Sequence, residues 1–586
     1  MTSQLTQTIP SSGRSIVQEA TRAELCFAIG LFVILLGLKI LYAFHYRIDS
    51  DEPQHLHVVW GWTRHLVPYR DYFDNHSPLF QLLCAPLFGA LGTRADIIVP
   101  MRLAMIPFFL LSLYFVGRIV GTLFSARVGL WAAMFAAVMP RYFFVTTEFR
   151  PDDMWMVLWL AMLFVAVSGA LNIGRAFVIG VLMGVSFCVS AKTLLLMVSM
   201  ALGSITILIL QWRIGLKTPK MRLLQLGLAI AGGTMILPVA LSLFFWSRGA
   251  LDQMFYCIVS HNVLPVAVVS ESGLVRGLKW ILFLALPIGI GIFLFPRCAG
   301  DARRTRALWI WLAAWFYYVT LKTCWPILAT EDYVASDPLF MAILAVVVVS
   351  LPGLQSRSPF TVRGSPFRVH GSPSVSTGFL LASLLVLLGL GMSLRSASPF
   401  EDRTRDKISM VATTLRLTQP SDFVMDSKGE TIYRKRPFYY VLEGLTGRRM
   451  KAGLIADTIP QRLVETQTPL ATVRRMPRLA ADFIRRNYVP IAFRLSVLGQ
   501  VLAAKGEKFN FEIAVPNVYS MVSEFGSFAG TLDGKDFSGP IRLEAGHHEI
   551  QRTGGSGRLA VLWARAVGKG YDPFSPVPPD VWTDQD

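Results

Sequence analysis

The sequence is short of charged residues for its length. Of its 586 residues, 16% are charged and 53% are hydrophobic, and the mean hydropathy is +0.49. A soluble globular domain has about 25% charged and about 45–50% apolar residues. The composition therefore excludes an ordinary cytosolic enzyme, a disordered protein and a disulfide scaffold. It is typical of an integral membrane protein with polar parts attached.

Cysteine is also scarce. All six cysteines lie in or beside apolar segments without the spacing of metal ligands, and none follows Cys324, so the C-terminal part can hold no disulfide. The net charge of +18 would suit a nucleic-acid-binding protein. Here, however, basic residues gather in short loops between apolar segments, as in membrane proteins. We expect no nucleic-acid partner.

Long apolar segments are abundant. A helix needs roughly 20 apolar residues to cross about 30 Å of hydrocarbon. The segment after the polar residues 1–24 is too long for a signal-peptide core and lacks a small-residue cleavage site, so we interpret it as a retained first span. The sequence predicts an α-helical polytopic membrane protein with about eleven spans, at 25–45, 101–121, 127–146, 154–171, 175–191, 193–212, 223–246, 277–296, 307–327, 338–352 and 378–396.

Basic loops predict the orientation of these spans. Arg and Lys cluster in alternate loops, near 118–127, 213–222, 297–306 and 357–368, and such loops face the cytoplasm. The N-terminus is then cytoplasmic, and we expect the protein in the cytoplasmic (inner) membrane. This parity requires that Leu79–Leu91, about 13 residues long, is an interfacial or re-entrant helix, since it is too short to span.

Acidic residues collect on the opposite side. Of 15 Asp and Glu residues between 25 and 396, only Asp301 falls in a loop predicted to be cytoplasmic. Acidic residues contribute little to topology, so this distribution indicates chemistry or cation binding at the outer face. The alternative is that the outer loops merely lack basic residues and look acidic for that reason.

After residue 396 the chain becomes polar, and by parity this part is extracytoplasmic. Residues 397–504 indicate an α/β region, with a helix near 403–417, a strand at 423–425 and a turn at 426–429. Residues 505–586 alternate in short apolar runs between Gly and Asp turns, which predicts a β-rich domain like a small β-sandwich. The membrane domain is then 25–396, with outer loops at about 46–100 and 147–153.

The densest set of reactive side chains follows the first span. Asp51 and Glu52 precede a proline at the start of an amphipathic helix expected to lie along the membrane, and His55 follows on that helix. His76 lies further on, before a Ser-Pro pair. The other interpretation is a capped interfacial helix whose acids only satisfy backbone amides.

Two further groups of polar residues are expected near the same face. Arg150, Asp152 and Asp153 end the third span, where buried and idle charges would be costly. Lys192 follows the fifth span, and it is placed either to meet a phosphate or, as is commoner for a lysine at a helix end, to snorkel. Weaker candidates are Arg102, His261 and Asn262.

In these residues the chain resembles the superfamily of membrane glycosyltransferases with the GT-C fold, and within it the branch of protein O-mannosyltransferases and lipid A aminoarabinose transferase. The resemblance covers roughly 25–350. The residues that carry it are Asp51-Glu52, Tyr69 to Pro78-Leu79, Arg102, Arg150-Pro151-Asp152 and Lys192. It implies transfer of a sugar from a polyprenyl-phosphate donor at the outer face.

The resemblance also implies roles for single residues. Asp51 matches the first-loop acid that is the catalytic residue or its metal ligand, and Asp152 matches the second-loop carboxylate. Lys192 and Arg102 match positions that hold the donor phosphate. The chain departs from the pattern before the proline of the first loop, where many relatives have Lys and this chain has His76-Ser77. That departure leaves one donor contact unassigned.

The chemistry of sugar transfer from a lipid phosphate also suits these residue types, independently of the resemblance. A sugar on a lipid phosphate has a good leaving group, so the reaction needs a proton acceptor and positive charge rather than a general acid. A divalent cation at Asp51 and Asp152 is left open, and no other cofactor is expected. The predicted site comprises catalytic Asp51, Asp152 and Glu52, donor phosphate-binding Lys192, Arg102 and Arg150, and acceptor- or sugar-binding His55, His76, Asp153, His261 and Asn262.

The predicted partners are a polyprenyl-phosphate-linked sugar, membrane lipids and a lipid, glycan or protein acceptor. Two other functions remain at this point. One is a transporter or flippase of lipid-linked sugars, although transporters commonly show internal repeats and charges near mid-membrane, whereas here the acids cluster in outer loops and no repeat is seen. The other is a non-catalytic, glycan-binding membrane scaffold that displays its C-terminal domain.

Overall fold

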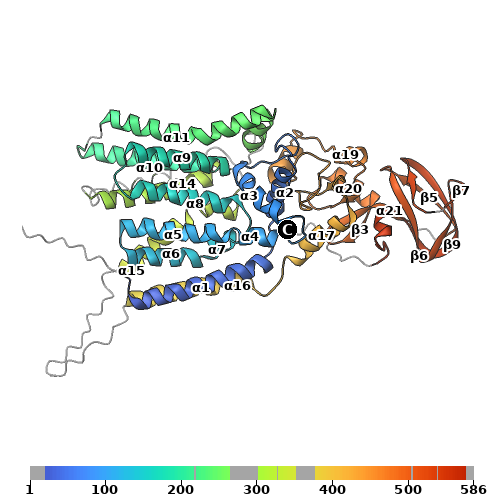
Figure 1. Cartoon of the computed structure of the whole chain (residues 1–586), viewed down its shortest axis with the longest axis horizontal. Helices are drawn as coiled ribbons and strands as arrows, with labels where there is room; N and C mark the ends of the chain where they lie inside the picture. Colours follow the sequence, from blue (N-terminus) through green and yellow to red (C-terminus); the bar gives the residue numbers. More distant parts are fainter. Residues whose placement is uncertain are drawn as a thin grey trace, which may run out of the picture.

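The computed structural model describes residues 20–216, 219–263, 285, 289, 301–325, 328–350, 377–502, 506–537 and 539–575. These residues form an elongated molecule with two parts (Figure 1). A bundle of long helices makes up one part, and a domain of short helices and strands sits at one end of the bundle.

Helices occupy ten of the eleven ranges that the sequence predicts as spans, while 277–296 lies outside the described residues apart from two isolated positions. The third predicted span is divided, because Pro140 begins a new helix after Val138, and a proline suits the first turn of a helix. The helices of the bundle are α1 (Arg22–His45), α5 (Ile106–Leu123), α6 (Ala126–Val138), α7 (Pro140–Val145), α8 (Pro151–Val167), α9 (Ile173–Val189), α10 (Thr193–Arg213), α11 (Lys220–Ser247), α14 (Ala302–Cys324), α15 (Asp337–Ser350) and α16 (Thr377–Ser396).

Within the described residues, 5 helices are long and apolar enough to cross a membrane: Arg22–His45, Ile98–Leu123, Thr193–Arg213, Lys220–Ser247 and Gly378–Ser396. Several of the others are apolar but shorter, among them Ala126–Val138, Ile173–Val189 and Asp337–Val349. The chain is thus an integral membrane protein. The total of eleven crossings stays a prediction.

Arg127 and Arg306, from two of the basic loops, lie at the end of the bundle where α1 begins. Arg127, after α5, donates from Nε to the Glu24 carboxylate in the first turn of α1 at 2.7 Å. Arg306, at the start of α14, donates to the carbonyl of Val167 at the end of α8. Figure 1 shows that this end is remote from the C-terminal domain. These two basic loops and the acidic loops beside the C-terminal domain therefore lie at opposite ends of the bundle. The orientation in the membrane stays a prediction.

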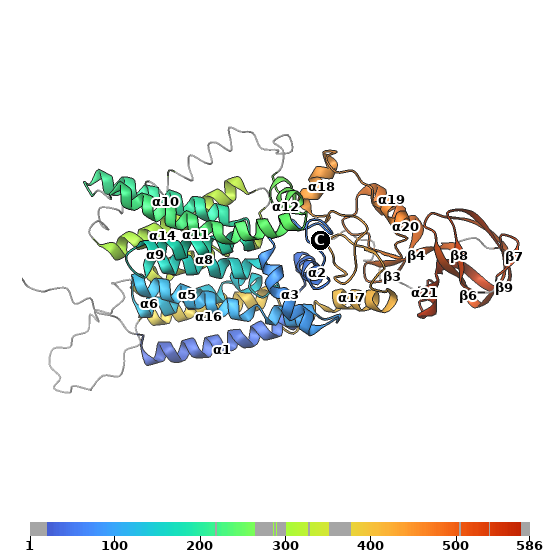
Figure 2. The same cartoon turned by 45° about the horizontal axis from the view of Figure 1, so that its top comes forward.

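Three short helices lie at the opposite end, beside the C-terminal domain: α2 (Asp51–Thr63), α3 (Leu79–Leu91) and α4 (Ile98–Leu103). Both flanks of α3 reach that domain, since the Tyr439 hydroxyl donates to the carbonyl of Tyr69, and the backbone amide of Arg94 donates to the Tyr433 hydroxyl. Figures 1 and 2 show α3 next to α2. Helix α3 thus starts and finishes at the same end of the bundle.

The C-terminal domain begins with the predicted helix α17 (Arg405–Leu417), strand β1 (Val424–Met425) and a turn. In β5 the residues alternate between exposed and buried, so that Phe509, Phe511 and Ile513 face the core. The remaining elements are α18 (Gly444–Lys451), α19 (Ile459–Glu465), β2 (Leu470–Ala471), α20 (Arg478–Asn487), β3 (Tyr488–Ala492), β4 (Leu495–Leu502), β5 (Lys508–Ile513), β6 (Asn517–Leu532), β7 (Lys535–Asp536), β8 (Ile541–Leu543), β9 (Gly546–Trp563) and α21 (Ala564–Gly568).

The strands differ from the predicted sandwich. Within the described residues they join in one branched sheet with the path β1-β2-β4-β9-β6-β7. Strand β4 links the two predicted regions, because its first half pairs with β2 and β3 and its second half pairs with β9. The boundary expected near residue 504 therefore does not separate two independent sheets.

Side-chain contacts fix the C-terminal domain to the bundle. The Arg449 guanidinium donates to the carbonyls of His261 and Val263, just after α12 (Leu251–Phe255) and the π-helix η1 (Tyr256–Ser260), at 3.0 and 2.8 Å. On the other side, Thr404 donates to the carbonyl of Phe44 at the end of α1. The two parts thus enclose the space between them.

Candidate active site

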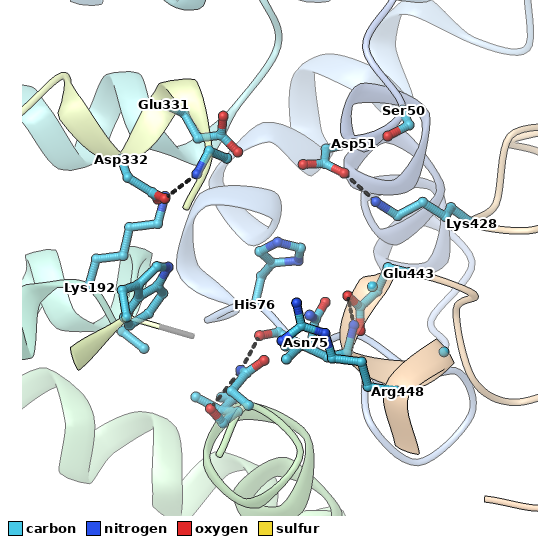
Figure 3. A pocket seen from close by; sticks show the side chains of 18 of the residues that line it. Ser50, Asp51, Asn75, His76, Lys192, Glu331, Asp332, Lys428, Glu443 and Arg448 are labelled. Carbon is cyan, nitrogen blue, oxygen red and sulfur yellow. Dashed lines mark hydrogen bonds and ion pairs between the residues drawn. The ribbon is translucent and has the colours of Figure 1, made fainter. Parts of the chain in front are cut away.

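A cavity of about 1940 Å³ lies between the end of the bundle and the C-terminal domain. Figure 3 shows that its charged side chains come from both parts and point toward a common space. The bundle contributes the loops before α2, α3, α8, α10 and α15, and the C-terminal domain contributes residues between 428 and 479. Segments far apart in the sequence therefore meet at one site.

Arg150 connects the acidic residues of the bundle side. It lies in extended backbone just before Pro151, which opens α8, so its side chain projects from the helix start into the cavity. Its guanidinium contacts the carboxylates of Asp51 at 2.7 Å and Asp152 at 3.5 Å. Further carboxylates within 3.1 Å of it are those of Asp49, Glu148 and Glu331.

Lys192 forms a second cationic centre. It occupies the last position before α10, and its ammonium contacts the carboxylates of Asp152 at 2.8 Å and Asp332 at 2.6 Å. Burial disfavours the charged ammonium, but these two carboxylates outweigh that effect and hold the pKa of Lys192 well above its usual value. The lysine therefore stays charged, and it does not snorkel to the surface.

The C-terminal domain inserts a lysine into this site. Lys428 is 5% exposed, and its ammonium contacts the Asp51 carboxylate. The turn that carries it is held by Asp426, which accepts from the backbone amide of Gly429. Gly429 has φ +78°, and a β-carbon there would lie 2.7 Å from His57 of α2, so only glycine fits. The turn is thus tightly seated against the bundle.

Burial and the two neighbouring cations act in opposite directions on Asp51. Desolvation raises the pKa of the Asp51 carboxyl, whereas Lys428 and Arg150 lower it, and their combined effect leaves it well below its usual value. Asp51 is therefore ionised at neutral pH.

A pair of histidines lines the same cavity. The His76 ring shares a hydrogen bond of 2.8 Å between its Nδ1 and the buried Asp74 carboxylate. The His55 ring lies with its centroid 4.6 Å from that of His76, and its Nδ1 is 3.2 Å from the Gln81 amide nitrogen. The structure thus places both predicted histidines at the site.

Glu52 and Arg102 are placed elsewhere. They do not line the cavity, and they form a fully buried ion pair with contacts of 2.7 and 2.6 Å. Glu52 also accepts from the backbone amide of Phe149 at 2.8 Å. The geometry therefore supports a bracing role for both residues and gives no support to their predicted catalytic and phosphate-binding roles.

Of the predicted acceptor- or sugar-binding residues, Asn262 reaches the cavity, while His261 and Asp153 do not. Asn262 lines the cavity and donates to the carbonyl of Asn75 at 3.0 Å. His261 is buried behind the cavity wall, where its Nε2 lies 3.2 Å from the Thr446 hydroxyl. Asp153 is also buried outside the cavity lining, and its carboxylate oxygens have no hydrogen-bond partner among the described residues.

The sequence did not identify five residues of the site: Asp49, Asp74, Glu331, Asp332 and Lys428. Four are acids of the one-sided distribution to which the sequence assigned no role. Lys428 was seen as part of a turn, but nothing in the sequence connects it with Asp51, 377 positions earlier. Pairing each outer acid with a basic partner would have needed the three-dimensional structure.

The possible cation stays a prediction. In the part of the chain that the structure describes, no group of three or more His, Cys, Asp or Glu side chains is arranged to hold a metal ion. The carboxylates of Asp51 and Asp152 are instead bridged by Arg150 and capped by lysines.

Comparison with known proteins identifies proteins that resemble this chain in sequence or in fold. Residues 75–241 match the family model described as dolichyl-phosphate-mannose-protein mannosyltransferase. No curated protein sequence matches the chain.

Two crystal structures of ArnT from Cupriavidus metallidurans share the fold. The apo structure superimposes with a TM-score of 0.52 at 14% identity, covering 81% of this chain and 98% of ArnT. The structure bound to undecaprenyl phosphate gives a TM-score of 0.51 at 13% identity, covering 82% and 98%. The predicted resemblance to GT-C membrane glycosyltransferases is thereby confirmed.

Proposed function

We propose that this protein is a membrane glycosyltransferase that moves a sugar from a polyprenyl-phosphate donor to a lipid, glycan or protein acceptor. The observation that carries the proposal is the cavity at the end of the bundle, where Asp51 and Asp152 meet Arg150 and two lysines. The fold shared with ArnT, which has been crystallised with undecaprenyl phosphate, supports the lipid-phosphate donor.

The charges of the cavity suit this chemistry. The leaving phosphate needs positive charge, which Lys192 and Arg150 supply once donor oxygens replace part of their carboxylate contacts. The carboxylates of Asp51 and Asp152 supply negative charge near the anomeric carbon, where positive charge develops as the bond to phosphate breaks. A general acid is dispensable because phosphate leaves readily.

The cavity also offers an apolar flank for the lipid tail. Leu194 of α10 and the residues Val259 and Val263 around η1 line it, and they are 52%, 40% and 65% exposed. Exposed aliphatic side chains next to a charged pocket suit a phospholipid-like donor, whose phosphate enters the pocket while its chain stays in the bilayer.

The finer features belong to the same proposal. We propose that the protein lies in the cytoplasmic (inner) membrane, with a cytoplasmic N-terminus and the C-terminal domain outside, because the basic residues Arg127 and Arg306 lie at the end of the bundle remote from that domain. The sugar is a hexose or a pentose, and Asp51 and Asp152 act as the catalytic carboxylates. A transporter is not favoured, since the acids of the site lie at the end of the bundle and are paired with cations.

Lipid and glycan profiling of cells with and without the gene tests the proposal. Loss of the gene should cause one polyprenyl-phosphate sugar to accumulate and one glycosidic linkage to disappear, and a gene encoding Asp51→Asn should not restore that linkage. A transporter would change the sidedness of a lipid and leave every glycosidic linkage in place. That outcome, or an unchanged lipid and glycan profile, would refute the proposed function.

A further inference from the structure

The carboxylates of the bundle side are all engaged by cations. Arg150 contacts Asp51, and Lys192 contacts both Asp152 and Asp332. The other two cavity carboxylates from this side, Asp49 and Glu331, contact Arg150. When donor oxygens replace part of the contacts of Arg150 and Lys192, Asp51 still holds the ammonium of Lys428. A carboxylate that keeps a cation on its lone pairs is a weak acceptor for the proton of an acceptor hydroxyl.

His76 is arranged differently. Its Nδ1 lies 2.8 Å from the Asp74 carboxylate, which is an acceptor when ionised and so requires the proton on Nδ1. This assignment leaves the lone pair on Nε2 of the neutral ring, and Nε2 has no hydrogen-bond partner in the part of the chain that the structure describes. The side chain is 30% exposed, and Figure 3 shows its ring between Asp51 and Lys192 in the middle of the cavity.

Asp74 is built to hold this ring. Its side chain is fully buried, and the same oxygen that meets Nδ1 also accepts from the backbone amide of His76 at 3.3 Å. The Gln54 amide approaches that oxygen at 3.4 Å from α2. Asp74 and Gln54 therefore fix the direction in which Nε2 points.

We propose that His76 is the general base of the transfer reaction and that Asp74 is its positioning residue. The inference rests on the proposed glycosyltransferase function. The acceptor hydroxyl transfers its proton to Nε2 of His76 as its oxygen bonds to the anomeric carbon of the sugar. The bond between that carbon and the phosphate oxygen breaks, and polyprenyl phosphate leaves with the electron pair. The proton on His76 is then released to solvent.

The charged groups around His76 set the pH range in which it works. Asp74 and Asp51 favour the imidazolium form, Lys428 opposes it, and Asp152 faces the ring from α8. Burial lowers the pKa of His76, but Asp74 outweighs burial and raises that pKa above its usual value. His55, which packs against the ring, stays neutral because burial and the charge on His76 hold its pKa well below the usual value.

Variants of purified protein test the proposal through the pH dependence of transfer. His76→Gln should reduce kcat about 10²- to 10⁴-fold, the scale of general base catalysis, while His547→Gln, at an exposed position of β9 in the C-terminal domain, should retain full activity. Because the base works only when neutral, the rate should fall on the acid side, and Asp74→Asn should move that fall to lower pH. If His76→Lys restores the rate, the residue supplies positive charge and the base assignment is overturned.

A second measurement does not depend on turnover, so it separates this inference from the proposed function. Diethyl pyrocarbonate reacts with neutral imidazole, and peptide mass spectrometry reports how much of His76 is modified at each pH. The midpoint should lie above that of a free imidazole, and it should decrease in Asp74→Asn. A ring that stays unmodified at every pH, or a midpoint unchanged by Asp74→Asn, would contradict the proposal even if the enzyme is active.

Discussion

Replacement of Lys428 by methionine tests whether the C-terminal domain completes the site. Lys428 is buried at the domain boundary, and its ammonium is one of two cations on the Asp51 carboxylate. Methionine keeps the length of the side chain and removes its charge. Asp51 keeps its contact with Arg150 at 2.7 Å, so the variant weakens the hold on the carboxylate without leaving it unpaired.

The expected loss follows from the kind of contact removed. A hydrogen bond to a charged group is worth about 1.5–3 kcal/mol, which corresponds to a decrease of about 10- to 100-fold in kcat/KM if the contact is needed in the transition state. The pH dependence of stability gives a second prediction for this variant. The pKa of Asp51 is depressed in the folded protein, so its ion pairs stabilise the fold at neutral pH and lose this effect as the pH falls through that depressed pKa.

The assay is transfer by purified Lys428→Met, with the exposed Lys569→Met as the matched control. The thermal midpoint of Lys428→Met should be below that of the wild type at pH 7, and the difference should shrink in acid. If Lys428 acts through Asp51, the double variant with Asp51→Asn should be no slower than Asp51→Asn alone. Fully additive losses, or wild-type kinetics in Lys428→Met, would show that Lys428 does not act through Asp51.

Three other expectations follow from the same contacts. Lys192→Ala should raise the apparent KM for the donor more than that for the acceptor, because its ammonium is placed to meet a phosphate; the reverse pattern in steady-state kinetics would reassign it. Glu52→Gln should lower the thermal midpoint of the detergent-solubilised protein, since breaking a buried ion pair costs about 3–5 kcal/mol. The fraction that stays folded should keep its turnover, and a large loss of turnover at unchanged stability would restore the catalytic role of Glu52. In a cysteine-free background, cysteines at Ser247 and Ser421 should react with an impermeant thiol reagent from outside and one at Arg213 should not, whereas labelling of position 213 from outside would invert the topology.

Much of the bundle could be predicted because apolar length and basic loops are local properties of the sequence. Apolar length and basic loops also predicted that α3 would start and finish on one side of the membrane. They placed Asp51, Asp152 and Lys192 at one end of the bundle. These residues do meet around Arg150. Counting the spans along the chain was sufficient to place these residues together, because each of them directly flanks a helix whose direction the basic loops predict.

Contacts between distant segments could not be predicted in this way. The approach of Lys428 to Asp51 depends on how the C-terminal domain docks, and no periodicity encodes it. Glu52 was expected at the site because it adjoins Asp51, but its side chain leaves α2 in another direction and pairs with Arg102. Successive helical residues point in different directions, so adjacency in sequence is a poor guide to a shared site.

Transfer in a reconstituted system is the decisive test of the proposed glycosyltransferase activity. Purified protein is incubated with polyprenyl-phosphate sugars labelled in the sugar and with cell-envelope acceptors, and both products are measured. We expect label to enter an acceptor through a new glycosidic bond while an equal amount of polyprenyl phosphate is released, and we expect Asp51→Asn to lower the rate at least about 10²-fold. Label that crosses the membrane on an intact donor, or transfer at the wild-type rate by Asp51→Asn, would contradict these expectations.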